Sequence, residues 1–251
     1  MPRHESMYLP ALRAHLKDFI ILAQAVEKEF RTKCSVETNE KERNNNFFVY
    51  HFLHRTILYS QSIQLLAENG FYHEAILVAR TILEGVINFE YYRDYHDIAD
   101  KWRLFMVYED GKKVANTVSL AAKHKWLYEK VEHKFGADMV DRAEKDFGFN
   151  YLPRESLTFS KMSLSDLINR ISDTKLRRQI RDQYDVIYNE FSQIAHWSPS
   201  GVIEGDFNAV AAVNVAIDAL YEISKEADKK YELGHNKDLN KLKIEAIKAL
   251  P

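Results

Sequence analysis

A chain of 251 residues, of which 46% are hydrophobic and 29% are charged, has the composition of a globular protein and the length of one large domain. Its 8 glycines and 5 prolines are too few for the many turns of an all-β fold. The single cysteine, Cys34, excludes an intrachain disulfide and a multi-cysteine metal site, and the net charge of −2 excludes a strong overall attraction to nucleic acid.

Three helices are expected in the first part of the chain. The first runs from Leu9 to Phe30 with Pro10 in its first turn, and a polar loop over residues 31–45 follows it. Asn46 is expected to cap the second helix, which ends at Asn69 and Gly70. The third helix runs from Tyr72 into residues 91–93.

The middle of the chain predicts two more helices and a long connection. Apolar residues recur with helical spacing over about 97–122 and about 125–144. Residues 145–162 contain Gly148 and Pro153 and show no periodicity, so they are expected to form the longest loop. Ser163 then begins a short helix with a pattern similar to a capping box.

Two long helices and a tail complete the pattern. One helix is expected from Thr174 to His196, and after a loop over 197–205 another runs from Asn208 to about Tyr231, capped by Asp206. The whole pattern predicts an all-α bundle of about seven or eight helices. We expect one helical domain over 1–251, with a core at 46–232, an N-terminal helix at 9–30 and a C-terminal tail helix at 238–250.

Two charged residues lie within the third helix, whose apolar residues from Ala75 to Phe89 occupy nearly every side. Such a helix is usually central, and a buried charge must be paired because an isolated one costs several kcal/mol. Arg80 and Glu84 are four residues apart and can pair with each other. They form either an internal ion pair that fixes the helix register or a site where Arg80 presents its guanidinium to an anion and Glu84 orients it.

A second polar row lies near the end of the helix predicted over 174–196. Tyr188, Ser192 and His196 are spaced four apart, just before a break at Pro199 and Gly201. His196 is either an exposed residue near a helix C-terminus or an acid/base group in a polar pocket. A serine-hydrolase mechanism is not expected, because no G-x-S-x-G elbow accompanies Ser192.

Other motifs argue against cofactors and metals. The one Glu-x-x-His sequence, Glu232 to His235, contains Gly234 at a probable helix end, whereas a di-iron bundle needs two such motifs on intact helices. Zinc-protease, Walker and dinucleotide-binding motifs are absent, so no metal and no cofactor are expected. The basic face of Arg177, Arg178 and Arg181 is interpreted as solvated surface.

The segment Ala79 to Glu84, followed about a hundred residues later by Tyr188, Ser192 and His196, resembles an uncharacterised bacterial family, DUF 5677. Its members combine an R-x-x-x-E helix with a later helix that ends in Y-x-x-x-S-x-x-x-H. The resemblance covers roughly residues 71–200 and carries no established activity. It implies that all five residues, Arg80, Glu84, Tyr188, Ser192 and His196, belong to one motif set and share a pocket.

The helical layout is also similar, more loosely, to the HEPN-type bundles of prokaryotic conflict systems. HEPN ribonucleases carry an arginine four to six residues before a histidine on one helix, and no histidine of this chain has one at that spacing. A mechanism of this kind would need Arg80 to stand in from another helix. The similarity therefore implies more about the fold than about a reaction.

Three functions follow from these observations. The preferred one is a binding or regulatory module that holds a small anionic ligand or a partner segment against Arg80, with Tyr188 and His196 as hydrogen-bonding groups. The second is a metal-independent ribonuclease of a defence system, in which His196 is the general acid/base and Arg80 stabilises phosphate charge on RNA. The third is a structural protein without a ligand, assembled as a homodimer or with a genomic-neighbour partner.

The chain lacks the sequence signals of export and of membrane insertion. Residues 1–10 are polar and do not contain the apolar stretch of a signal peptide. No run of about 18 apolar residues is long enough for a transmembrane helix. We therefore expect a cytoplasmic protein that has no membrane partner.

Overall fold

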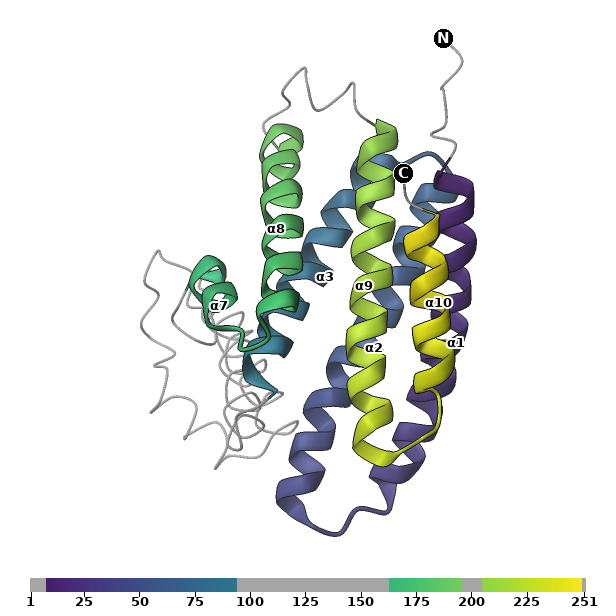
Figure 1. The fold of residues 1–251 in the computed structure, drawn as a ribbon, viewed down its shortest axis with the longest axis vertical. Coiled ribbons are helices and arrows are strands. Elements are labelled where there is room, and N and C mark those ends of the chain that lie inside the picture. The colour runs from purple at the N-terminus through teal and green to yellow at the C-terminus, as the bar shows by residue number, and fades with distance from the viewer. Residues whose placement is uncertain (1–7, 94–162, 196–204, 250–251) are drawn as a thin grey trace, which may run out of the picture. The chain divides into compact units, whose positions relative to one another are not determined.

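A computed structural model of the protein describes residues 8–93, 163–195 and 205–249. Within these ranges the chain is an all-α bundle of seven helices and contains no strand (Figure 1). The helices are α1 (Leu9–Ser35), α2 (Glu40–Glu68), α3 (Tyr72–Tyr92), α7 (Leu164–Arg170), α8 (Thr174–Ala195), α9 (Gly205–Tyr231) and α10 (Asn236–Lys248). The described helices belong to one compact unit, which combines residues 1–94 with residues 164–251.

The helices predicted over 97–122 and 125–144, and the loop at 145–162, lie outside the described residues. The single domain expected over 1–251 therefore stays a prediction. None of the helices in the described ranges combines the length and the apolar character that a membrane crossing requires. The fold class is the all-α bundle that the hydrophobic periodicity predicts.

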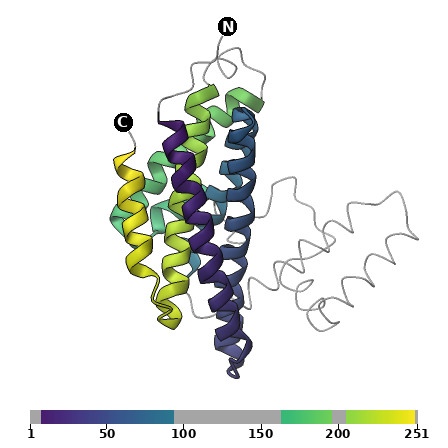
Figure 2. The same cartoon turned by 90° about the vertical axis from the view of Figure 1, so that its right-hand side faces the viewer.

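The α9 helix forms the centre of the unit, where it packs against α1, α2 and α3 (Figures 1 and 2). Small side chains explain this close contact on several sides, because alanine lets neighbouring helix backbones approach one another. Alanines at positions 209, 212, 216 and 219 of α9 are at most 2% exposed. Larger residues such as Leu220 and Ile223 fill the remaining space and are fully buried.

Three phenylalanines link α2 to α3 inside the core. The ring of Phe89 on α3 is stacked on Phe48, with centroids 5.8 Å apart, and lies 5.5 Å from Phe52. Phe48 and Phe52 are themselves 4.8 Å apart on α2. Phe89 is fully buried. Tyr92 is also buried, so both of these aromatic residues near the end of α3 are packing residues.

The polar loop predicted over residues 31–45 is wrong, because α1 continues to Ser35 and α2 already begins at Glu40. The N-cap of α2 is Asn39, whose side chain accepts a hydrogen bond of 3.2 Å from the backbone N–H of Glu42. Glu37 in turn accepts a hydrogen bond from the backbone N–H of Asn39 at 2.9 Å. These local hydrogen bonds start a helix whose first turns are too polar to show a hydrophobic period.

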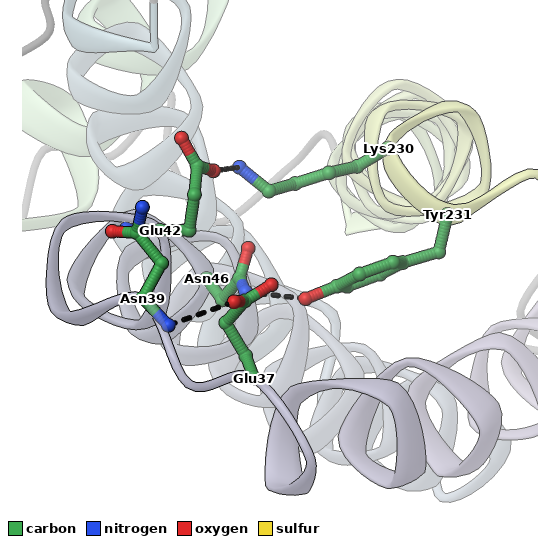
Figure 3. Close-up of polar contacts among 6 residues, drawn as sticks. All are labelled: Glu37, Asn39, Glu42, Asn46, Lys230 and Tyr231. Carbon is green, nitrogen blue, oxygen red and sulfur yellow. Dashed lines mark hydrogen bonds and ion pairs between the residues drawn. The ribbon is translucent and has the colours of Figure 1, made fainter.

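Asn46, predicted to be the cap, is instead buried inside α2 and joins this helix to the end of α9 (Figure 3). Its side-chain amide donates a hydrogen bond to the hydroxyl of Tyr231. An ion pair of 3.4 Å between Lys230 and Glu42 lies beside this hydrogen bond. A buried asparagine is stable only with a hydrogen-bonding partner, and that partner comes from a helix 185 residues away in the chain.

Arginines of α8 hold the short helix α7 in place, which corrects the interpretation of Arg177, Arg178 and Arg181 as solvated surface. Arg181 donates to the hydroxyl and the carbonyl of Ser165, both at 3.0 Å, and to the side chain of Asn169 at 2.8 Å. Arg177 donates to the carbonyl of Asn169 at 3.2 Å. Of the three arginines, only Arg178 is exposed.

The tail helix predicted over 238–250 corresponds to α10, which packs against α9 and α1 (Figure 2). Leu239 and Ala246 are the buried residues of this helix. The helix predicted from Asn208 begins three residues earlier, at Gly205, so that Asp206 lies inside α9 and does not cap it. The amphipathic character of the tail is thus used within the chain, and a homodimer stays a prediction.

We expect the free energy of unfolding to fall in acid because of His51 on α2. Burial, with help from Arg55 and His54, lowers the pKa of His51 from 6.5 to about 4. Between these two values the unfolded chain binds a proton that the folded chain does not, so stability falls as the pH falls through this window, by about 1.4 kcal/mol per unit. Urea unfolding at about pH 7 and about pH 5 should show this loss, and His51→Gln should remove about 2 kcal/mol of it. An equal loss in the variant would contradict this role of His51.

Candidate functional site

Arg80 and Glu84 form the ion pair on α3 that their spacing predicts. The Nε of Arg80 donates to Oε1 of Glu84 at 2.8 Å. The pair is not sealed inside the core, because 28% of the Arg80 side chain and 37% of the Glu84 side chain remain exposed. Both charges therefore reach solvent, although the apolar residues around them predict a central helix. Although α2, α7, α8 and α9 all pack against α3, a stripe of α3 through Arg80, Thr81 and Glu84 still reaches solvent.

Tyr188 on α8 joins this pair and brings the two sequence motifs together. Its hydroxyl donates to Oε1 of Glu84 at 2.6 Å, the same oxygen that accepts from Arg80. The guanidinium carbon of Arg80 lies over the Tyr188 ring, 4.5 Å from its centroid, which is a cation–π contact. Arg80, Glu84 and Tyr188, hereafter the Arg80 cluster, thus combine residues that are 104 positions apart in the chain.

The contacts of the Arg80 cluster shift the pKa values of Tyr188 and Arg80. Burial raises the pKa of Tyr188 well above its usual value, and the hydrogen bond to the Glu84 carboxylate raises it further. Burial alone would lower the pKa of Arg80, but the hydrogen bonds with Glu84 and Tyr188 raise it on balance. Tyr188 is therefore a hydrogen-bond donor and not a proton acceptor, and Arg80 is a permanent cation.

A family model described as "Family of unknown function (DUF5677)" matches residues 46–209. The chain belongs to this family. The matched region of this DUF5677 member includes Arg80, Glu84, Tyr188, Ser192 and His196. Comparison with curated proteins and with solved structures gives no match. The family description assigns no activity, and the looser similarity to HEPN-type bundles stays a prediction.

The remaining two residues of the predicted motif set are not placed beside the Arg80 cluster by the described geometry. Ser192 lies one turn beyond Tyr188 on α8, and only its position in the helix is described. His196 lies outside the described residues, directly after the last residue of α8. The shared pocket of all five DUF5677 residues is therefore a prediction, of which three residues are now seen in contact.

Two further polar residues, near the start of α3, were missed by the sequence analysis. Asn208 near the start of α9 is fully buried, and its side-chain nitrogen lies 3.0 Å from Nδ1 of His73 on α3. His73 precedes Arg80 by seven residues, which places both on one face of the helix. That spacing was the available signal for His73. The signal for Asn208 was an asparagine in an apolar helix. The sequence analysis used this residue only as the start of the predicted helix.

Two histidines elsewhere in this DUF5677 member each contact a single carboxylate. Nδ1 of His54 lies 2.7 Å from Glu27, and Nε2 of His235 lies 3.1 Å from Glu29. In the ranges that the structure describes, no three residues among His, Cys, Asp and Glu are grouped as metal ligands would be.

Proposed function

We propose that the protein is a binding or regulatory module in which the Arg80 cluster, continued by Ser192 and His196, holds the anionic group of a small ligand or partner segment. The observation that carries the proposal is the orientation of the Arg80 guanidinium. Glu84 fixes its Nε at 2.8 Å, and the Tyr188 ring supports its flat face at 4.5 Å. A guanidinium that is fixed in this way loses little further freedom when it binds a carboxylate or a phosphate.

The partial exposure of the cluster supports a ligand from solution. A ligand from solution can reach the guanidinium directly, because 28% of the Arg80 side chain stays accessible. Oε1 of Glu84 accepts one hydrogen bond from Arg80 on α3 and a second from Tyr188 on α8. The position of Arg80 therefore depends on the packing of α8 on α3, which could couple ligand binding to the position of α8.

The test is a titration with inorganic phosphate of the full chain labelled with ¹⁵N. The Nε–H signal of Arg80, assigned by its absence in Arg80→Ala, should shift and saturate, because the guanidinium contacts the anion directly. Calorimetry should show that Arg80→Ala weakens this binding about tenfold or more, the effect of losing one charge-assisted contact. Arg178→Ala, which removes an exposed cation from α8, should bind like the unmodified chain.

Circular dichroism of the same variants separates binding from folding. We expect Arg80→Ala to keep its helix content, since surface-accessible ion pairs contribute about 1 kcal/mol or less. If Arg80→Ala unfolds, the internal ion pair is structural and the binding proposal is wrong. The proposal would also be contradicted if the Nε–H signal of Arg80 shifted only in parallel with the Nε–H signal of Arg178 and did not saturate as phosphate is added.

A ribonuclease is the second candidate, because Arg80 contacts α8, the helix that leads directly to His196. In this case His196 would move protons and Arg80 would stabilise the charge on a phosphate of RNA. Incubation of the purified chain with single-stranded RNA tests the idea. RNA cleavage that continues unchanged in His196→Ala would remove this candidate.

A further inference from the structure

A hollow that is separate from the Arg80 cluster lies over α9, between α8 and α10. It has a volume of about 420 Å³, which is in the range of small-molecule sites, of about 300–1,000 Å³. Figure 1 shows α8 and α10 on either side of α9. Residues of α3, α8, α9 and α10 line this hollow, hereafter the α9 groove, and no residue of the Arg80 cluster belongs to its lining.

Cationic side chains from four elements converge on the α9 groove. Arg93 comes from the end of α3, Lys175 from α8, Lys225 and Lys229 from α9, and Lys243 from α10. Lys225 and Lys229 are four residues apart, so they are neighbours on the helix surface, and both are exposed. Cations that share one groove repel each other unless negative charge compensates them.

Carboxylates at the groove compensate these cations only in part. Asp173 caps α8, where it accepts hydrogen bonds from the backbone N–H groups of Lys175 and Leu176 at 2.9 and 3.0 Å. Glu226 lies 3.8 Å from Arg93. Burial raises the pKa of Glu222, against the opposing effect of the positive charges of Lys225 and Arg93. The lining thus holds three carboxylates, Asp173, Glu222 and Glu226, against five cations.

Lys243 is held by a carboxylate below the groove. It forms an ion pair with Asp218 of α9, which also accepts hydrogen bonds from the side chains of Gln179 at 2.6 Å and Gln183 at 2.5 Å. The Lys225 ammonium lies over the ring of Tyr221, 5.2 Å from its centroid, and the Lys243 ammonium lies 5.7 Å from it. Two ammonium groups of the groove thus lie beside one aromatic ring.

We propose that the α9 groove binds a soluble small molecule that carries two or more linked phosphates. Lysine ammonium groups bind phosphate as point charges, and the cations of this groove are distributed over α3, α8, α9 and α10. A chain of phosphates can contact several of them at once, and its charge would compensate the cations that the carboxylates leave. The apolar side chains of Leu176 and Ile247 on the groove walls could contact the remainder of the molecule.

The test is calorimetric titration of the full chain with inorganic triphosphate. Replacing both exposed lysines of α9, Lys225→Ala with Lys229→Ala, should weaken binding about tenfold or more, and added salt should weaken it in the unmodified chain. The matched control replaces Lys237 and Lys241, an exposed pair on α10 with the same spacing that does not line the groove, and it should bind normally.

Three results would overturn the proposal. They are the absence of triphosphate binding, equal binding by the Lys225/Lys229 variant, and an equal loss in the Lys237/Lys241 control. A phosphorylated lipid headgroup has the same chemistry, so a second arm uses phosphatidylcholine vesicles that contain phosphatidylinositol bisphosphate. Binding to these vesicles without binding to triphosphate would contradict a soluble ligand. The triphosphate titrations are repeated in the Arg80→Ala background, which removes the other proposed anion site, so the failure of one site does not decide the other.

Discussion

Replacing Asp218 with leucine should destabilise the protein by about 3–5 kcal/mol, because it removes one partner from a buried ion pair. Asp218 is 7% exposed, and its carboxylate is the common acceptor for Lys243, Gln179 and Gln183. Without it, a buried ammonium and two side-chain amides lose their partner, and each must be desolvated without compensation. Urea unfolding at neutral pH, followed by circular dichroism, measures the loss.

The double variant Asp218→Leu with Lys243→Met separates the ion pair from simple packing. When both charges are replaced by apolar groups of similar volume, the desolvation cost of the unpaired ammonium disappears, so part of the lost stability should return, while Gln179 and Gln183 still lack their acceptor. Lys243→Met alone should destabilise the chain, because it leaves the Asp218 carboxylate buried without its cation. Single and double effects that add within about 0.5 kcal/mol would show that the two residues are not coupled.

Phe89→Ala should cost about 3–5 kcal/mol, the range for truncating a fully buried phenylalanine. The substitution removes the ring that contacts both Phe48 and Phe52, so it leaves a cavity between α2 and α3 and also loses two aromatic contacts. Phe89→Leu refills much of the volume and should cost clearly less.

Phe207→Ala is the matched control for the core prediction. This phenylalanine lies on α9 with 51% of its surface exposed, and its truncation should change stability by about 0.5 kcal/mol or less. Thermal and urea unfolding of the three variants beside the unmodified chain give the comparison. Equal losses for Phe89→Ala and Phe207→Ala would contradict the position of Phe89 in the core.

Features that depend on local spacing could be predicted from the sequence. The four-residue separation predicts the Arg80–Glu84 ion pair, which the structure confirms at 2.8 Å. The helical periodicity predicts the all-α fold and the positions of α3, α8, α9 and α10 within a few residues. Local patterns work here because residues three or four apart on a helix are neighbours whatever the tertiary fold.

Features that depend on distant partners could not be predicted from local patterns. Asn46 looked like a helix cap, yet its partner is Tyr231 of another helix. Asp218 carried the same signal as Arg80, a charged residue inside an apolar helix, but its three partners lie on α8 and α10. Tyr188 was grouped with Arg80 through the family resemblance, and only the packing of α8 on α3 shows the contact.

A crystal structure of the protein soaked in selenate tests the central claim most directly, because selenium scatters anomalously and marks the position of a bound oxyanion. We predict an anomalous peak within about 4.5 Å of the guanidinium carbon of Arg80. The imidazole of His196 should lie within about 8 Å of that guanidinium, on the same side as the anion. An Arg80 that contacts only Glu84 and Tyr188, with no peak beside it and with His196 facing solvent elsewhere, would show that the cluster is structural.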